Sequence, residues 1–149
     1  MSIRTGRRLG VDVGRARIGV AVCDRDGLLA TPLETVPRDD ALDVPRILAL
    51  AADYDVIEIV VGLPLSLSGD DTPSTTDARA FAARIAAELP VRLVDERLST
   101  VSAQRGMRQA GRNTKQSRAV IDQAAAVIIL QHALDRERAA GAPPGFPLP

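Results

Sequence analysis

Short apolar runs alternate with turn residues along the first third of the chain. The runs at 8–13, 17–23 and 28–36 are rich in valine, isoleucine and leucine, which fit a buried strand. The segments between them, 14–16 and 24–27, carry glycine, arginine and aspartate and are short enough for tight turns. This pattern predicts three consecutive antiparallel strands.

Helical and strand patterns alternate in the rest of the chain. Asp43 can cap a helix, Thr72 followed by Pro73 marks the start of another, and Ser99 and Thr114 can cap two more. The predicted elements are a helix at 43–53, a strand at 56–61, a helix at 73–89, a strand at 91–94, and helices at 99–111 and 114–140. Together with the first three strands, they indicate an α/β fold with a mixed five-stranded sheet and helices on both faces.

The length and composition indicate a single domain. A chain of 149 residues, 46% of them hydrophobic, can bury its own core. We expect the domain to span residues 1–140. Residues 141–149 contain four prolines and are expected to form a disordered tail without a role in the core.

The composition also excludes several classes of protein. Cys23 is the single cysteine, so an intramolecular disulfide is excluded. No apolar run approaches the length of a membrane span or a signal peptide, and we expect a cytoplasmic protein with no membrane partner. The three aromatic residues are too few for the base-stacking platforms that read single strands.

Acidic residues interrupt three strongly apolar segments. Asp12 lies near the end of the first predicted strand, Asp95 and Glu96 follow the last one, and Asp122 lies inside the last helix. An unpaired carboxylate is costly to bury, so an apolar strand or helix face has no structural use for one. If the fold gathers these residues, they will repel one another unless divalent cations neutralise them.

Each of these acids also has a structural interpretation. Asp12 could cap the turn at Gly14 or pair with a nearby arginine, and Asp122 could pair with Arg118 one helical turn earlier. Asp95 and Glu96 point to opposite sides of a strand, so only one can face a shared site. We expect that residue to be Glu96, with Asp95 as the close alternative.

The net charge of zero hides an uneven distribution. Residues 97–121 carry six basic residues and no acidic one, which leaves 13 basic and 19 acidic residues in the rest of the chain. The basic residues are Arg97, Arg105, Arg108, Arg112, Lys115 and Arg118. Because this block lies between the second and third acidic points, it could hold a polyanion over them.

Four segments resemble the YqgF (RuvX) family of pre-16S rRNA nucleases, which are related to Holliday-junction resolvases. They are LGVDVGRARIGVAVCD at 9–24, VVGLPLSLSG at 60–69, LVDERLSTVSAQ at 93–104 and AVIDQAAAVIILQ at 119–131. The resemblance implies a ribonuclease H-like fold, a divalent metal, and carboxylates at Asp12, Glu96 (or Asp95) and Asp122. It covers nearly the whole chain except the tail.

The same chemistry follows from the residue types. Carboxylates select hard cations such as Mg²⁺ or Mn²⁺, and two such ions can activate a water and stabilise a leaving oxygen. In this interpretation Asp12 bridges the metals, Glu96 and Asp122 complete their shells, and Arg17 with the basic block positions the phosphates. His132 has no nucleophile motif beside it, so a catalytic triad has no support.

Three functions compete at this point. The first is a metal-dependent endonuclease that processes the 5′ end of precursor 16S rRNA during ribosome biogenesis, binding structured RNA. The second is a Holliday-junction resolvase, which would bind branched DNA as a two-fold dimer, whereas the first could act as a monomer. The third is a non-catalytic RNA-binding assembly factor. An actin-like ATPase is disfavoured because it needs two such domains.

Overall fold

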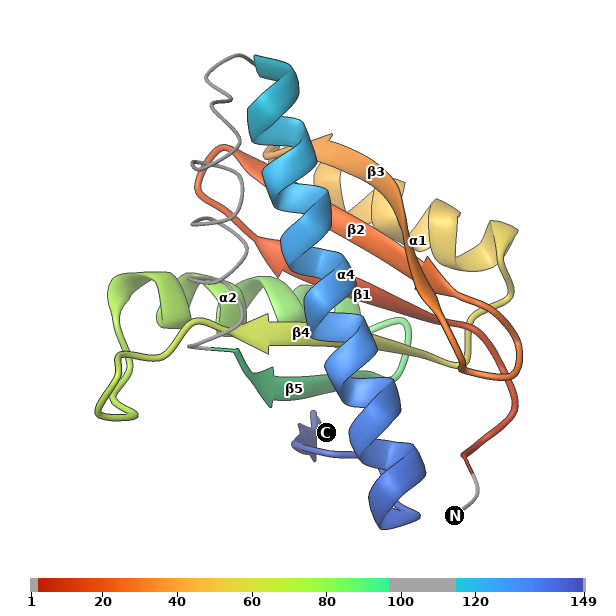
Figure 1. Ribbon diagram of the computed structural model, residues 1–149. Helices are drawn as coiled ribbons and strands as arrows, with labels where there is room; N and C mark the ends of the chain where they lie inside the picture. Colours follow the sequence, from red (N-terminus) through yellow and green to blue (C-terminus); the bar gives the residue numbers. More distant parts are fainter. Residues whose placement is uncertain (1–2, 97–114, 149) are drawn as a thin grey trace.

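The computed structural model describes residues 3–96 and 115–148, which form one twisted sheet with helices on both faces (Figure 1). The strands are β1 (Arg8–Val13), β2 (Arg17–Cys23), β3 (Ala30–Pro37), β4 (Glu58–Leu63), β5 (Val91–Asp95) and β6 (Phe146–Pro147). The helices are α1 (Asp43–Asp53), α2 (Pro73–Ala86) and α4 (Lys115–Ala140). The predicted α/β class is therefore confirmed.

The sheet has the order β3-β2-β1-β4-β5-β6. The first three strands pair antiparallel, as predicted, and β4 and β5 then add parallel to β1. Because β1, β4 and β5 run in the same direction, their carboxyl ends meet at one edge of the sheet. Residues that follow these strands in the sequence are thereby brought together in space.

Two separate apolar cores lie on the two faces of the sheet. Alternation along β1 sends Leu9 and Val11 toward α1 and α2, where Ile47 and Phe81 complete a large buried cluster. On the other face α4 crosses the strands obliquely (Figure 1), and Leu130 lies in a second cluster with small residues of β2 and β4. The same alternation places Asp12 on the α4 face.

The C-terminal tail departs from the sequence prediction. The sheet has a sixth strand, because Phe146 and Pro147 pair antiparallel with β5. The Leu148 N–H donates to the Val91 carbonyl at 2.9 Å, and the Leu148 side chain packs against the larger core. The prediction of a disordered tail is therefore wrong for these residues. An edge strand exposes unpaired backbone groups, and a short proline-containing segment can cover them without extending the sheet further.

The helix starts are partly as predicted. Thr72 caps α2 and forms a reciprocal capping box with Thr75. Asp43 does not cap α1: the N-cap is Leu42, and the Asp39 carboxylate accepts hydrogen bonds from the preceding turn instead. The expected helix at 99–111 and the cap at Thr114 lie outside the described residues. In the parts of the chain that the structure describes, no helix is long and apolar enough to cross a membrane.

Candidate active site

The three predicted acidic points converge at the carboxyl edge of the parallel strands. Asp12 lies one residue before the end of β1, Glu96 directly follows β5, and Asp122 comes from α4. The Glu96 N–H donates to the Leu63 carbonyl at 3.1 Å, which continues the strand pairing one residue beyond β5. Asp12 lies within electrostatic reach of both other carboxylates. The structure therefore brings together residues that stand up to 110 positions apart in the sequence.

Asp12 is strongly perturbed by its surroundings. Burial raises the pKa of Asp12 to about 7, and the negative charges of Asp122 and Glu96 act in the same direction. Among the described residues, no basic group contributes to this shift. A carboxyl that holds its proton to neutral pH gains the most from a cation that favours its charged form.

Glu96 and Asp95 lie on opposite sides of the chain, as strand alternation predicts. The Glu96 side chain is buried and Asp95 is exposed. An added Cβ on Gly62 would stand 3.0 Å from Glu96 Cγ and 2.6 Å from Ile129 Cδ1, so the glycine makes room for both side chains. His132 Nδ1 of α4 lies 4.0 Å from Glu96 Oε2. This placement favours Glu96 as the site residue.

Asp122 is brought to the sheet by an unusually close helix approach. An added Cβ on Gly19 would collide with the Asp122 carbonyl oxygen, so only glycine allows this contact. Gly19 is also the residue that faces Asp12 in the pairing of β1 with β2. Gly19 thus lets α4 lie close to β2, directly beside the position of Asp12 in β1.

Asp122 forms an ion pair across the site. Arg17 Nε donates to Asp122 Oδ2 at 2.8 Å. Burial raises the pKa of Asp122, and Arg17 opposes part of that rise. Arg17 was predicted to hold phosphates, and here it neutralises one candidate ligand. The alternative pairing of Asp122 with Arg118 involves a side chain outside the described part of the structure.

The donor set fits a hard divalent cation. The carboxylates of Glu96 and Asp122 raise the pKa of Asp12, and the three together supply the oxygen ligands that Mg²⁺ and Mn²⁺ prefer. Among residues 3–96 and 115–148, however, no three acidic, histidine or cysteine side chains are already placed to hold one metal ion. Binding by Asp12, Glu96 and Asp122 therefore requires side-chain adjustment.

The predicted basic block is mostly outside the described residues. Arg97, Arg105, Arg108 and Arg112 lie there, and Lys115 and Arg118 fall in the first turns of α4. The structure adds an exposed arginine that the sequence analysis did not select, Arg15 in the turn between β1 and β2. Its position two residues before Arg17 was the available signal.

Sequence comparisons connect the chain to nucleases. Residues 6–136 match the family model described as RuvX, Holliday junction resolvase. A protein of Clavibacter michiganensis subsp. michiganensis is 63% identical, over 99% of this chain and 94% of its own length. A protein of Leifsonia xyli subsp. xyli is 60% identical, over 98% and 96%. Both carry the name "Putative pre-16S rRNA nuclease".

Structure comparisons show which fold the chain has. Thermus thermophilus RuvC superposes with a TM-score of 0.52 at 18% identity, covering 95% of this chain and 99% of that one. RuvC of the same organism in complex with a Holliday junction substrate gives a TM-score of 0.54 at 19% identity, with the same coverage. The predicted ribonuclease H-like fold is therefore confirmed.

Proposed function

The chain belongs to the RuvX family, and on this premise we propose that it is a metal-dependent endonuclease that trims the 5′ end of precursor 16S rRNA. We further propose that Asp12, Glu96 and Asp122 hold Mg²⁺ or Mn²⁺ in the cytoplasm, where rRNA precursors are processed. Names of the relatives supply the substrate, and the geometry of the site supplies the chemistry.

The observation that carries the proposal is the convergence of three carboxylates from β1, the end of β5 and α4. Burial and mutual repulsion make this cluster unfavourable in the absence of a cation. A fold gains nothing from such a cluster, whereas a site that binds cations and phosphates needs one.

Each residue has a separable role in this mechanism. Bound cations would activate a water molecule and stabilise the leaving oxygen of the phosphodiester. Asp12, which lies within electrostatic reach of both other acids, would hold the cations together with Glu96 and Asp122. Arg15 and Arg17 lie at the same edge and can hold the phosphate groups of the strand.

Junction resolution is the second candidate. It is favoured by the description of the matching family as a Holliday junction resolvase. A resolvase must present two active sites to two strands and therefore acts as a dimer, whereas trimming one rRNA end needs a single site. The oligomeric state in solution and the preferred substrate separate these functions.

The decisive experiment compares two substrates under one set of conditions. The wild-type protein is incubated with a 5′-extended 16S rRNA fragment and with a four-way DNA junction, in Mg²⁺, in Mn²⁺ and in EDTA. We expect metal-dependent cleavage of the RNA. Cleavage of the junction alone would favour the resolvase, and cleavage of neither, together with no Mn²⁺ binding, would contradict an enzymatic role.

A further inference from the structure

We infer that Arg17 occupies the cation position at Asp122 in the metal-free protein and exchanges this carboxylate for a substrate phosphate when a divalent cation binds. The inference rests on the proposed function and assigns Arg17 a role that alternates between two partners. It predicts that Arg17 opposes metal binding while it supports substrate binding.

The first observation is the way in which the Arg17–Asp122 pair is made. Arg17 donates to Asp122 through Nε, and among the side chains of residues 3–96 and 121–148 its two Nη groups have no hydrogen-bond acceptor. Asp122 accepts only through Oδ2 within the same residues. A guanidinium has five N–H donors, so with respect to these described side chains Arg17 has donor capacity for a second partner.

The second observation is solvent access. The Arg17 side chain is 34% exposed and that of Asp122 is 16% exposed. Arg17 is the first residue of β2, directly after the exposed turn that holds Arg15. A partly exposed side chain in this place can rotate from the helix toward the solvent.

The third observation is the charge balance. Asp12 lies within electrostatic reach of both Glu96 and Asp122, and among the described side chains Arg17 forms an ion pair with Asp122. A divalent cation bound there would satisfy Asp122 and repel the guanidinium at the same time. Arg17 would then be a free cation next to the metal, where a phosphodiester carries its negative charge.

A fixed supporting role makes the opposite prediction. If Arg17 only held Asp122 in the orientation that a metal requires, its loss would weaken metal binding. If Arg17 competes with the metal, its loss will strengthen metal binding. The sign of the change therefore separates the two roles.

The test measures Mn²⁺ affinity by isothermal titration calorimetry, without substrate. We expect Arg17→Gln to bind Mn²⁺ about five- to tenfold more tightly than the wild type, because a competing ion pair is removed. Arg17→Lys, which keeps the positive charge, should lie between them. The matched control is Arg46→Gln, because Arg46 forms a similar exposed pair with Glu34 at 2.6 Å far from the site. It should bind like the wild type.

Two further measurements complete the test. In an Asp122→Asn background, Arg17→Gln should no longer tighten Mn²⁺ binding, because the carboxylate for which Arg17 and the metal compete is absent. At saturating Mn²⁺, Arg17→Gln should raise the KM for the RNA several-fold, with a smaller change in kcat.

The outcomes that overturn the inference are distinct. Mn²⁺ binding that is unchanged or weakened in Arg17→Gln, with normal binding by the wild type, would overturn the exchange and leave the proposed function standing. A wild-type protein that binds no Mn²⁺ would overturn both. Circular dichroism of each variant verifies that the fold is retained.

Discussion

Helix α4 carries ionisable residues onto the sheet at two places, and the protein treats them in opposite ways. Near the C-terminal end of α4, burial acts to raise the pKa of Glu137, but hydrogen bonds from Arg4 and the charge of Arg8 outweigh it and hold the pKa at about 2. Toward the other end, α4 brings Asp122 close to Asp12 of β1. There, burial and the neighbouring acids raise the pKa of Asp12 to about 7. Both clusters lie on the same face of one sheet.

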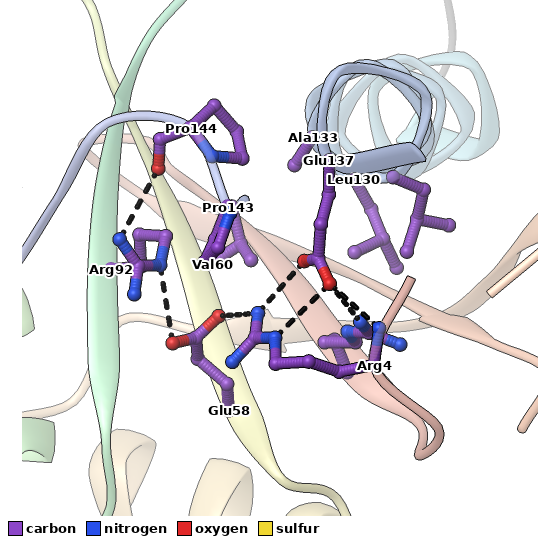
Figure 2. A pocket seen from close by; sticks show the side chains of 11 residues that line it. Arg4, Glu58, Val60, Arg92, Leu130, Ala133, Glu137, Pro143 and Pro144 are labelled. Carbon is purple, nitrogen blue, oxygen red and sulfur yellow. Dashed lines mark hydrogen bonds and ion pairs between the residues drawn. The ribbon is translucent and has the colours of Figure 1, made fainter. Parts of the chain in front are cut away.

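In the cluster around Glu137, the acidic side chains are paired with arginines (Figure 2). Arg4 contacts both oxygens of Glu137 and also reaches Glu58 at 2.9 Å. Arg8 adds a bond of 3.0 Å to Glu137, and Arg92 pairs with Glu58 at 3.2 Å. These contacts join the N-terminal segment, β1, β4, β5 and α4, so the cluster fastens the ends of the chain to the sheet.

The difference shows how a structural charge cluster can be told from a functional one. Charges that serve the fold are paired with opposite charges when they are buried, because the unpaired state is costly. At the cluster of Asp12, Glu96 and Asp122, the charges of the other two acids raise the pKa of Asp12, which fits a site that awaits an external cation.

The largest effect is expected on catalysis. Asp12→Asn, Glu96→Gln and Asp122→Asn should each lower Mg²⁺- or Mn²⁺-dependent cleavage by about a thousandfold or more, because each removes a charged ligand while nearly preserving shape. Single-turnover cleavage of the rRNA fragment measures this. Asp95→Asn is the matched control, because Asp95 is the exposed neighbour of Glu96. If Asp95→Asn were the inactive variant and Glu96→Gln the active one, the choice between them would be wrong.

The second effect is expected on stability at the other cluster. Glu137→Gln should lower the free energy of unfolding at pH 7 by about 3 kcal/mol, because it leaves Arg8 buried without its partner. Glu34→Gln, which breaks the exposed pair with Arg46, should cost less than about 1 kcal/mol. Urea unfolding of both variants makes the comparison. Equal losses of unfolding free energy would show that the buried cluster contributes no more to stability than the exposed pair does.

The two clusters should also respond oppositely to pH in metal-free buffer. The folded-state pKa of Asp12 lies above that of an unfolded aspartate, about 3.9, so its contribution to stability decreases as the pH rises from about 4 to about 7. Asp12→Asn should therefore be more stable than the wild type by about 2 kcal/mol at pH 8 and nearly equal to it at pH 4. Chemical unfolding at both pH values provides the measurement. A less stable variant at pH 8 would indicate a structural role for Asp12.

For Glu137 the sign is reversed. Its folded-state pKa of about 2 lies below that of an unfolded glutamate, about 4.3. The stability it supplies is therefore present above about pH 4.3 and is lost as the pH falls toward 2. The difference in stability between the wild type and Glu137→Gln should decrease over this range, as followed by thermal unfolding at a series of pH values. A difference that is constant with pH would show that ionisation of Glu137 does not supply this stability.

The smallest effect concerns the basic block. Replacement of a phosphate-contacting member of Arg105, Arg108, Arg112, Lys115 and Arg118 by alanine should flatten the plot of log affinity against log salt by about 0.9 on a duplex, or about 0.7 on a single strand. We expect two or three of the five to matter, because neighbours on a helix do not all share one face. Binding in Ca²⁺ to a structured RNA and to a four-way junction tests each variant. Five wild-type slopes would mean that the polyanion is held elsewhere.

Local sequence patterns determined most of the secondary structure. The strands of the first third, the helix 43–53 and the cap at Thr72 depend on neighbouring residues, and the structure has them where the pattern predicts. The three acidic points could also be recognised, because a carboxylate inside an apolar run is conspicuous whatever its partners are. Alternation along a strand further predicted that Asp95 and Glu96 would point to opposite sides.

Only the tertiary structure decided which residues meet. The pairing of Phe146 with β5, the ion pair between Arg17 and Asp122, and the collision that only Gly19 avoids all join residues far apart in the chain. The same arginine could have paired with Asp12, five residues away, as the sequence allowed. Such contacts depend on how strands are ordered and how closely a helix packs, and neither quantity is encoded in a local pattern of polar and apolar positions.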